Sequence, residues 1–444
     1  MSEPSDKLTS LSRGPLNELS VLELVRLLEE KAISVEALVG DCLDRIAERE
    51  AQVKAWVYID RKAALTQARL LDKGARRGVL HGIPVGIKDI IDTADLPTGY
   101  GSDIYRTHQP QIDASVIATL KSQGGVLLGK TVTTEFAHRV PGPTTNPWDV
   151  SRTPGGSSSG SAAAVADYMV PLALGTQTTA STIRPASFCG VIGYRPSYGS
   201  ISCSGIKANA PSFDTPGLFA RSVADCSLLS DVLLEKAYAP LSVSSRAPRI
   251  GFCRTPFWKS MQPEAAEFIE KAIHQISRRG GLIQDFSLPP ELLGVLAAHR
   301  TISSYELARA LGTERHYHPA QLSATIREGK IAEGMRYTQQ EYVSAQITLE
   351  SARARMLDLL DGVDVLIAPS ANGIAPVGLE STGTPEFCTI WTALHVPALT
   401  LPLPEKCDSM PLGIQLIGKR GMDRQLFEGA LWIEQALGAV NAIA

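Results

Sequence analysis

The chain has 444 residues, of which 44% are hydrophobic and 20% charged, and its formal net charge is −3. This length suffices to bury a large core in one domain or in two to three smaller ones. The near-neutral charge argues against nucleic-acid and anionic-membrane partners, since both favour a basic surface. No run approaches the ~18 apolar residues that a membrane-spanning helix requires.

The seven cysteines are widely scattered and form no C-x-x-C pair. This pattern is typical of reduced, structural thiols and not of a zinc or redox centre. The first residues also lack the basic and then apolar pattern of a secretory signal peptide. We therefore expect a cytoplasmic protein, with no metal site and no other cofactor.

The N-terminal part of the chain, residues 15–80, is predicted to form a layer of helices. Apolar residues recur at helical spacing after Ser20 and after Ser34, and serine is a favoured N-cap residue. A short strand is predicted over 53–59, and a third helix over 61–73.

Further along the chain, apolar strands alternate with helices. The predicted strands are 82–89, 125–130, 169–174, 191–194, 249–253, 363–368, 399–403 and 412–417. The predicted helices are 113–122, 222–235, 263–279, 340–361 and 423–437. This alternation predicts an α/β fold whose sheet is covered by helices on both faces. Residues 288–361 are mostly helical, and we expect either a cap over the substrate pocket or a plain surface layer.

Residues 124–131 match the P-loop pattern G-x-x-x-x-G-K-[ST], which binds phosphates in NTPases. A P-loop follows a strand and opens a helix, whereas here the apolar residues inside the motif look like the strand itself. The context therefore argues against NTPase function. Lys130 is expected to be a solvated or hydrogen-bonded lysine at the end of that strand.

Residues 156–160 match G-x-S-x-G, the nucleophile elbow of α/β-hydrolases, with Ser158 as the nucleophile. The elbow needs a buried strand directly upstream, but residues 146–154 are polar and interrupted by prolines. None of the eight histidines lies in a persuasive setting for a triad. An esterase that uses Ser158 is kept as the weaker alternative.

Lys88, Ser157 and Ser181 form a third candidate site. A serine hydroxyl is a poor nucleophile unless a base removes its proton. With no histidine nearby, a lysine must act as that base, and burial among apolar residues can lower its pKa from about 10.4. Singly, Lys88 fits a salt bridge with Asp89, and the serines fit turns or helix caps. Together the three residues favour nucleophilic catalysis.

The segments around these residues resemble the amidase signature family, whose Ser-cisSer-Lys enzymes hydrolyse amides and related carbonyl compounds. The matching segments are G-I-P-V-G-I-K-D at 82–89, T-E-F-A at 134–137, N-P-W-D at 146–149, T-P-G-G-S-S at 153–158, G-Y-R-P-S-Y-G at 193–199 and P-L-G-I-Q-L-I-G at 411–418. The resemblance implies one domain over 1–444, with a mixed sheet of about eleven strands between helical layers and a catalytic core at 82–235.

The resemblance also implies a role for each residue of the candidate site. Lys88 corresponds to the general base, Ser157 to the bridging serine in a cis peptide, and Ser181 to the nucleophile that forms the acyl-enzyme. The implied oxyanion hole consists of backbone N–H groups of four residues, Thr178, Thr179, Ala180 and Ser181.

The chain departs from the family pattern close to the nucleophile. Thr179-Ala180 stands where the family usually has Gly-Gly, and Gln177 replaces the usual Asp. Alanine is strained at a position that needs positive φ. Either this loop therefore keeps ordinary φ values, or its oxyanion hole is altered.

We therefore predict a hydrolase that cleaves the C–N bond of a small-molecule amide, anilide, carbamate or urea. Phe136, Ile183 and Trp391 are candidate pocket residues, and they suggest an apolar or aryl group on the substrate. The main alternative is an amidotransferase A-type subunit that works in a complex. The oligomeric state is left open, with a homodimer as one option.

Overall fold

An eleven-stranded sheet runs through the computed structural model, which describes residues 14–243 and 246–438. In spatial order its strands are β1 (Trp56–Tyr58), β3 (Val126–Thr131), β2 (Pro84–Lys88), β4 (Leu172–Gln177), β6 (Thr215–Ala220), β5 (Ile192–Arg195), β10 (Ala398–Pro402), β11 (Gly413–Ile417), β9 (Val365–Pro369), β7 (Arg249–Phe252) and β8 (Leu282–Asp285). Strand β2 pairs in parallel with β3 and β4, and β7 does so with β8 and β9. The remaining pairs are antiparallel. The sheet is therefore mixed, as predicted.

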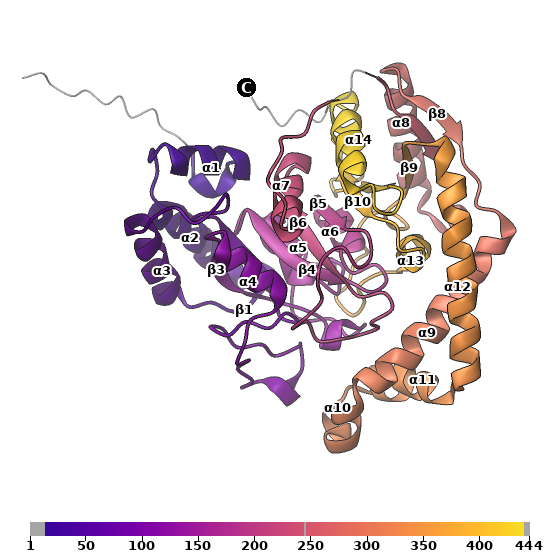
Figure 1. Cartoon of the computed structure of the whole chain (residues 1–444), viewed down its shortest axis with the longest axis horizontal. Helices are drawn as coiled ribbons and strands as arrows, with labels where there is room; N and C mark the ends of the chain where they lie inside the picture. The colour runs from indigo at the N-terminus through magenta and orange to yellow at the C-terminus, as the bar shows by residue number, and fades with distance from the viewer. Residues whose placement is uncertain (1–13, 244–245, 439–444) are drawn as a thin grey trace, which may run out of the picture.

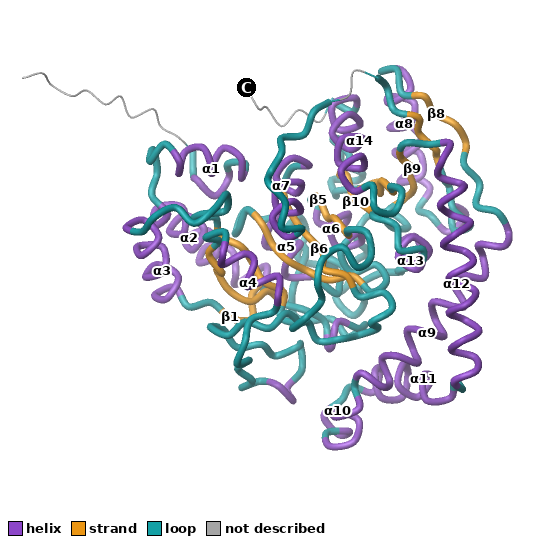
Figure 2. The backbone as a smooth tube through the Cα atoms, viewed as in Figure 1, coloured by secondary structure: helices purple, strands orange, loops and turns teal. Residues whose placement is uncertain are grey.

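The α-helices surround this sheet (Figures 1 and 2). They are α1 (Val21–Glu29), α2 (Val35–Val53), α3 (Arg61–Lys73), α4 (Ser115–Ser122), α5 (Ser159–Ala166), α6 (Ile183–Cys189), α7 (Val223–Leu233), α8 (Pro263–Arg278), α9 (Gly294–Ala310), α10 (Gly312–Tyr317), α11 (Ala332–Arg336), α12 (Gln339–Leu359), α13 (Glu386–Ala393) and α14 (Asp423–Ala436). Helices α5 and α6 contact each other and the centre of the sheet, while α7 and α14 pack together over its opposite face.

Burial explains why the central strands were recognisable in the sequence. Every residue of β2 to β6, β9 and β11 is buried, as expected for strands that are covered on both faces. The α/β fold and its sheet are confirmed. Strands β6 and β8 were missed, because Pro216 interrupts the strand pattern of β6 and β8 is an exposed edge strand. The short helices α5 and α6 were missed because they are almost wholly buried and have no solvent-exposed polar face.

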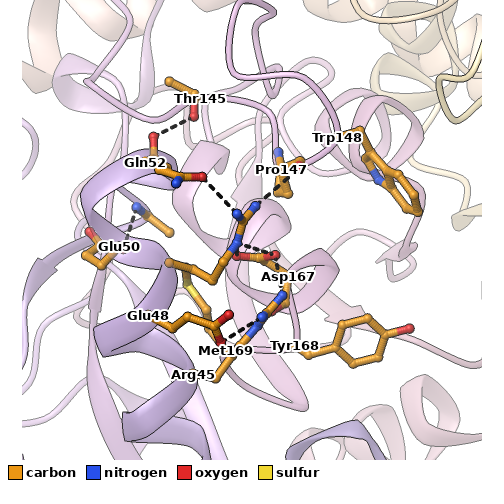
Figure 3. A network of polar contacts seen from close by, with 12 residues as sticks. Arg45, Glu48, Glu50, Gln52, Thr145, Pro147, Trp148, Asp167, Tyr168 and Met169 are labelled. Carbon is orange, nitrogen blue, oxygen red and sulfur yellow. Dashed lines mark hydrogen bonds and ion pairs between the residues drawn. The ribbon is translucent and has the colours of Figure 1, made fainter.

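The N-terminal helices are joined to the segment that carries the candidate serines. Asp167 follows the last residue of α5, and its buried carboxylate forms ion pairs with Arg45 and Arg49 of α2, both at 2.9 Å. Figure 3 shows this network, in which Arg45 also contacts Glu48. The two arginines thus tie α2 to the turn between α5 and β4.

Helices α9 to α12 lie together at one edge of the molecule (Figure 1). Helix α9 packs against α11, α12 and α13, and a π-helix, Thr325–Ile331, directly precedes α11. All seven cysteines are free. Among the described residues, no helix is both long and apolar enough to cross a membrane. The same ranges contain no group of three or more His, Cys, Asp or Glu side chains that could hold a metal ion.

Candidate active site

Lys88 is the last residue of β2 and lies at the centre of the candidate site. Its side chain is fully buried, and its Nζ donates hydrogen bonds to Ser157 Oγ and to Thr176 Oγ1, both at 2.7 Å. Burial lowers the pKa of Lys88 well below its usual range, while the charge of Asp214 acts in the opposite direction. A lysine in this setting favours the neutral amine, which can accept a proton.

Ser157 lies in the turn that precedes α5, and the Gly156–Ser157 peptide bond is cis, as the resemblance implied. Its carbonyl oxygen accepts a hydrogen bond from the backbone N–H of Thr134 at 3.3 Å. The next N–H, that of Ser158, donates to the carbonyl oxygen of Ser181 at 3.3 Å. The turn at Ser157 is thus hydrogen-bonded both to the segment of Ser181 and to the side chain of Lys88.

Gly156 has a specific steric role in this turn. A Cβ atom at this position would lie 2.7 Å from Thr382 Cγ2, closer than van der Waals contact permits. Glycine, which has no side chain, is therefore required here, because it lets the backbone of Ser157 approach its neighbours.

The segment from Thr178 to Ser181 has an unusual distribution of backbone hydrogen bonds. All four carbonyl oxygens are bonded, to His299 Nε2 (3.1 Å), Thr392 Oγ1 (2.7 Å), and the N–H groups of Arg184 (3.1 Å) and Ser158 (3.3 Å). None of the four N–H groups has an acceptor among residues 14–243 and 246–438. A row of free backbone N–H donors is the arrangement that stabilises an oxyanion.

The departures from the family pattern in this loop have a structural explanation. Neither Thr179 nor Ala180 has a φ in the left-handed region, so the loop needs no glycine at these positions. Gln177 Oε1 accepts hydrogen bonds from the N–H groups of Thr182 (2.9 Å) and Ile183 (3.0 Å) at the start of α6. An amide oxygen thus serves here as the acceptor for two N–H groups at the helix start.

Three residues that the sequence analysis missed hold this loop from outside. Asp214 Oδ1 accepts a hydrogen bond from Thr178 Oγ1 at 2.5 Å, and Thr392 Oγ1 accepts one from Gln177 Nε2 at 3.0 Å. Burial lowers the pKa of His299 to about 4, so this histidine is neutral near pH 7 and donates from Nε2 to Thr178. No local pattern marks these residues, which lie far from the loop in the sequence.

The predicted pocket residues are all buried. Phe136 lies in the turn after Thr134, Ile183 is the first residue of α6, and Trp391 lies in α13 next to Thr392. Trp391 adjoins Thr392, which is bonded to the loop before α6, Ile183 is itself bonded to Gln177, and Phe136 lies two residues after Thr134, which is bonded to Ser157. The indole Nε1 of Trp391 has no hydrogen-bond partner in the described part of the chain. Contact of these residues with substrate stays a prediction.

The residues of the rejected motifs have other partners. Ser158 is buried, and its Oγ bonds to the backbone of Thr176 in β4, which disfavours it as a nucleophile. Lys130 is fully buried and donates to Ile91 O (2.7 Å) and Thr98 Oγ1 (2.6 Å). The expectation of a solvated Lys130 was wrong, and that of a hydrogen-bonded one is confirmed. Asp89 pairs with Lys130 at 3.4 Å.

Replacing Thr392 by valine should impair catalysis through the position of the loop. This change keeps the shape of the side chain but removes the hydrogen bonds to Gln177 and Thr179. We expect kcat to fall about tenfold, equivalent to about 1.4 kcal/mol, and the free energy of unfolding to fall by about 1–3 kcal/mol. Steady-state kinetics and thermal unfolding measure the two effects.

Thr389→Val is the matched control for this change. Thr389 lies in the same helix, α13, but its hydroxyl donates only to Pro385 O at the start of that helix. We expect kcat to be preserved in this variant. Equal kcat values for Thr392→Val and Thr389→Val would show that Thr392 does not position the loop.

Comparison with known proteins agrees with this geometry. The amidase family profile matches residues 37–427. The chain is 32% identical to the A-type subunit of the glutamyl-tRNA(Gln) amidotransferase of Trichormus variabilis, covering 94% of this chain and 97% of that protein. A crystal structure described as an amidase superposes with a TM-score of 0.86 at 29% identity, over 94% of this chain and 99% of that one.

The native peptide amidase of Stenotrophomonas maltophilia is similar as well. It superposes with a TM-score of 0.81 at 28% identity, and the match covers 96% of this chain and 98% of that chain. The family profile spans most of the sequence, and these structures share the complete fold. The chain belongs to the amidase signature family.

Proposed function

We propose that the protein hydrolyses a C–N bond of an amide-type small molecule through an acyl-enzyme formed on Ser181. The observation that carries this proposal is the buried Lys88 Nζ, which donates to Ser157 Oγ at 2.7 Å beside a loop whose N–H groups have no acceptor in the described part of the chain. Family membership supports the same chemistry. In this proposal Lys88 is the base, Ser157 relays the proton and Ser181 is the nucleophile.

The first half of the reaction forms the acyl-enzyme. The oxygen of Ser181 attacks the substrate carbonyl carbon, while its proton passes through the Ser157 hydroxyl to the neutral amine of Lys88. The carbonyl oxygen gains negative charge and accepts hydrogen bonds from the N–H groups between Thr178 and Ser181. The C–N bond then breaks, and the proton returns through Ser157 to the leaving nitrogen.

The second half restores the enzyme. A water molecule attacks the acyl carbon and passes a proton along the same relay to Lys88. A second oxyanion forms in the same loop, and the bond to Ser181 breaks. Ser181 regains its proton from Lys88 through Ser157, and the carboxylic acid leaves. The relay therefore ends each turnover in its starting protonation state.

The proposal includes the surroundings of the site. Helices over 288–361 would cover the substrate pocket. The contact between His299 of α9 and the carbonyl of Thr178 supports this arrangement. Phe136, Ile183 and Trp391 would line the pocket. The scattered free cysteines are consistent with a reducing compartment, so we retain a cytoplasmic location.

The substrate class is tested with the purified chain alone. We expect hydrolysis within panels of primary amides, 4-nitroanilides, carbamates and ureas, with one amine released for each acid formed. Mass spectrometry of the trapped protein should show the acyl group on Ser181. An acyl group on Ser158 would instead support the esterase alternative.

A second candidate function is that of an amidotransferase subunit. Relatives that span nearly the whole chain, at 29% and 32% identity, are named as the A-type subunit of glutamyl-tRNA(Gln) amidotransferase. This function predicts no hydrolysis by the purified chain, and a gain of activity when the other subunits of such a complex are added. Hydrolysis by the chain alone, unchanged by those subunits, would exclude it.

A further inference from the structure

Lys330 lies beside the proposed active site but has no role in the mechanism above. It belongs to the π-helix Thr325–Ile331, and its Nζ donates to Ser303 Oγ in α9 at 2.9 Å. Ser303 and His299 are four residues apart on α9 and both are buried, so they share one face of the helix. His299 contacts the carbonyl of Thr178. Lys330 is thus placed about one helical turn, ~5 Å along α9, from that contact.

The segment before the π-helix contacts the turn that bonds to Ser157, because the N–H of Ser323 donates to Glu135 Oε1 at 3.1 Å. Thr134 of this turn donates its N–H to Ser157 O, and its Oγ1 donates to His138 O at 2.7 Å. The positive charges of Lys330 and Arg139 both act on His138, which burial chiefly holds at a pKa of about 3. Lys330 is thus bonded to α9, Arg139 follows His138 in the chain, and the charges of both cations act on His138.

These two cations lack acidic partners. Among the described residues, neither Lys330 nor Arg139 has a carboxylate within ion-pair distance. Glu333, whose charge acts on Lys330, is paired with Arg300 at 2.5 Å. Burial, together with the charges of Arg139 and Arg300, lowers the pKa of Lys330 to about 8. A bound anion would offset the burial of Lys330 and the mutual repulsion of these cations.

We propose that Lys330 and Arg139 bind a carboxylate group of the substrate, and that the enzyme therefore prefers amides that carry an acidic group. This inference rests on the proposed function, because it places the carboxylate beside the reacting carbonyl. The π-helix at Lys330 is consistent with it, since such segments are frequent at functional sites. Lys330 is thus a specificity residue for the reaction.

Paired substrates test this preference. Succinyl- and glutaryl-4-nitroanilide carry a carboxylate, whereas butyryl- and pentanoyl-4-nitroanilide have similar shapes without one. We expect kcat/KM to be about 10- to 100-fold higher for an acidic member than for its neutral partner, as for a charge-assisted hydrogen bond. Equal values for both members of each pair would overturn the inference.

Substitutions then assign the preference to Lys330. Lys330→Met should remove it while leaving kcat/KM for the neutral substrates within about threefold. Lys330→Arg should retain it, because the charge remains. Lys62→Met removes a charge from α3, which lies at the opposite end of the molecule from α9, and should change kcat/KM for neither kind of substrate (Figure 1). An equal loss for acidic and neutral substrates in Lys330→Met would indicate a structural role and contradict the proposal.

The pH dependence provides a second readout. The protonated form of Lys330 binds the carboxylate, so KM for the acidic substrates should rise above about pH 8, and KM for the neutral ones should not. The other charged groups around Lys330 do not titrate there, since arginines stay protonated, His138 is neutral and the pKa of Glu333 is lowered. In Lys330→Arg the rise should move beyond about pH 10.

Failure of this inference can be told apart from failure of the proposed function. If the anilides are hydrolysed without an acidic preference, only the inference fails. If none of the anilides is hydrolysed, a binding measurement still tests the inference. Calorimetry with glutarate should then give a dissociation constant about tenfold larger for Lys330→Met than for the unmodified chain. Equal binding of glutarate by both proteins would overturn it.

Discussion

Replacing Ser181 by alanine is expected to lower kcat at least about 10⁴-fold, since loss of a catalytic nucleophile leaves only the contributions of binding and the oxyanion hole. The fold should be unaffected. The hydroxyl of Ser181 has no hydrogen-bond partner among the described residues, and the carbonyl oxygen that accepts from Ser158 N is retained. Steady-state turnover and thermal unfolding of the same preparation measure both expectations.

Ser158→Ala is the matched control, because it removes the neighbouring hydroxyl that the G-x-S-x-G motif would select. That hydroxyl bonds to the backbone of Thr176 in β4, so its loss should reduce the free energy of unfolding by about 1 kcal/mol. Turnover should largely persist. Loss of turnover in Ser158→Ala, with turnover kept in Ser181→Ala, would contradict the proposed mechanism and support the esterase alternative.

Replacing Lys88 by methionine is expected to lower kcat by about 10²- to 10⁴-fold, the range for loss of a general base. Methionine keeps the apolar stem and removes the amine that bonds to Ser157 and Thr176. The amine must be neutral to accept a proton, so kcat of the unmodified enzyme should rise with pH through the lowered pKa of Lys88 and then level off. The variant should lack this rise.

Lys130→Met is a suitable comparison for Lys88→Met. Both lysines are fully buried on neighbouring strands, but Lys130 pairs with Asp89 and has no contact with the serines. Its removal leaves a buried carboxylate unpaired, so the free energy of unfolding should fall by about 3 kcal/mol. The rise of kcat with pH should persist in the protein that folds. Loss of that rise in Lys130→Met alone would assign the base to Lys130.

The difference between these lysines illustrates how far the sequence could predict the site. Both end apolar segments that are recognisable as buried strands. In the parallel pair of β2 and β3, however, Lys130 lies opposite Ile87, and Lys88 opposite Thr131, after a shift in register between Val85 and Gly86. Neighbouring residues of a strand point to opposite faces, so the two lysines face different sides of the sheet. The face to which each lysine points is therefore known only from the pairing of the two strands.

The support of the oxyanion loop was beyond the reach of the sequence for a similar reason. Thr178 to Ser181 were predicted as a group, because they are contiguous in a family motif. Asp214, His299 and Thr392 contact this loop from positions 36 to 213 residues away in the chain. Such contacts depend on which elements pack together, and the spacing of residues in the sequence does not predict them.

The sequence by itself determined the α/β class and most of the buried strands, because burial leaves a local pattern of apolar residues. It also identified Lys88, Ser157 and Ser181 as candidates. The tertiary structure decided which lysine faces Ser157, that Thr179 and Ala180 keep ordinary φ values, and that the charge of Arg139 acts on Lys330. These features arise from register and packing between distant segments, which a linear pattern does not encode.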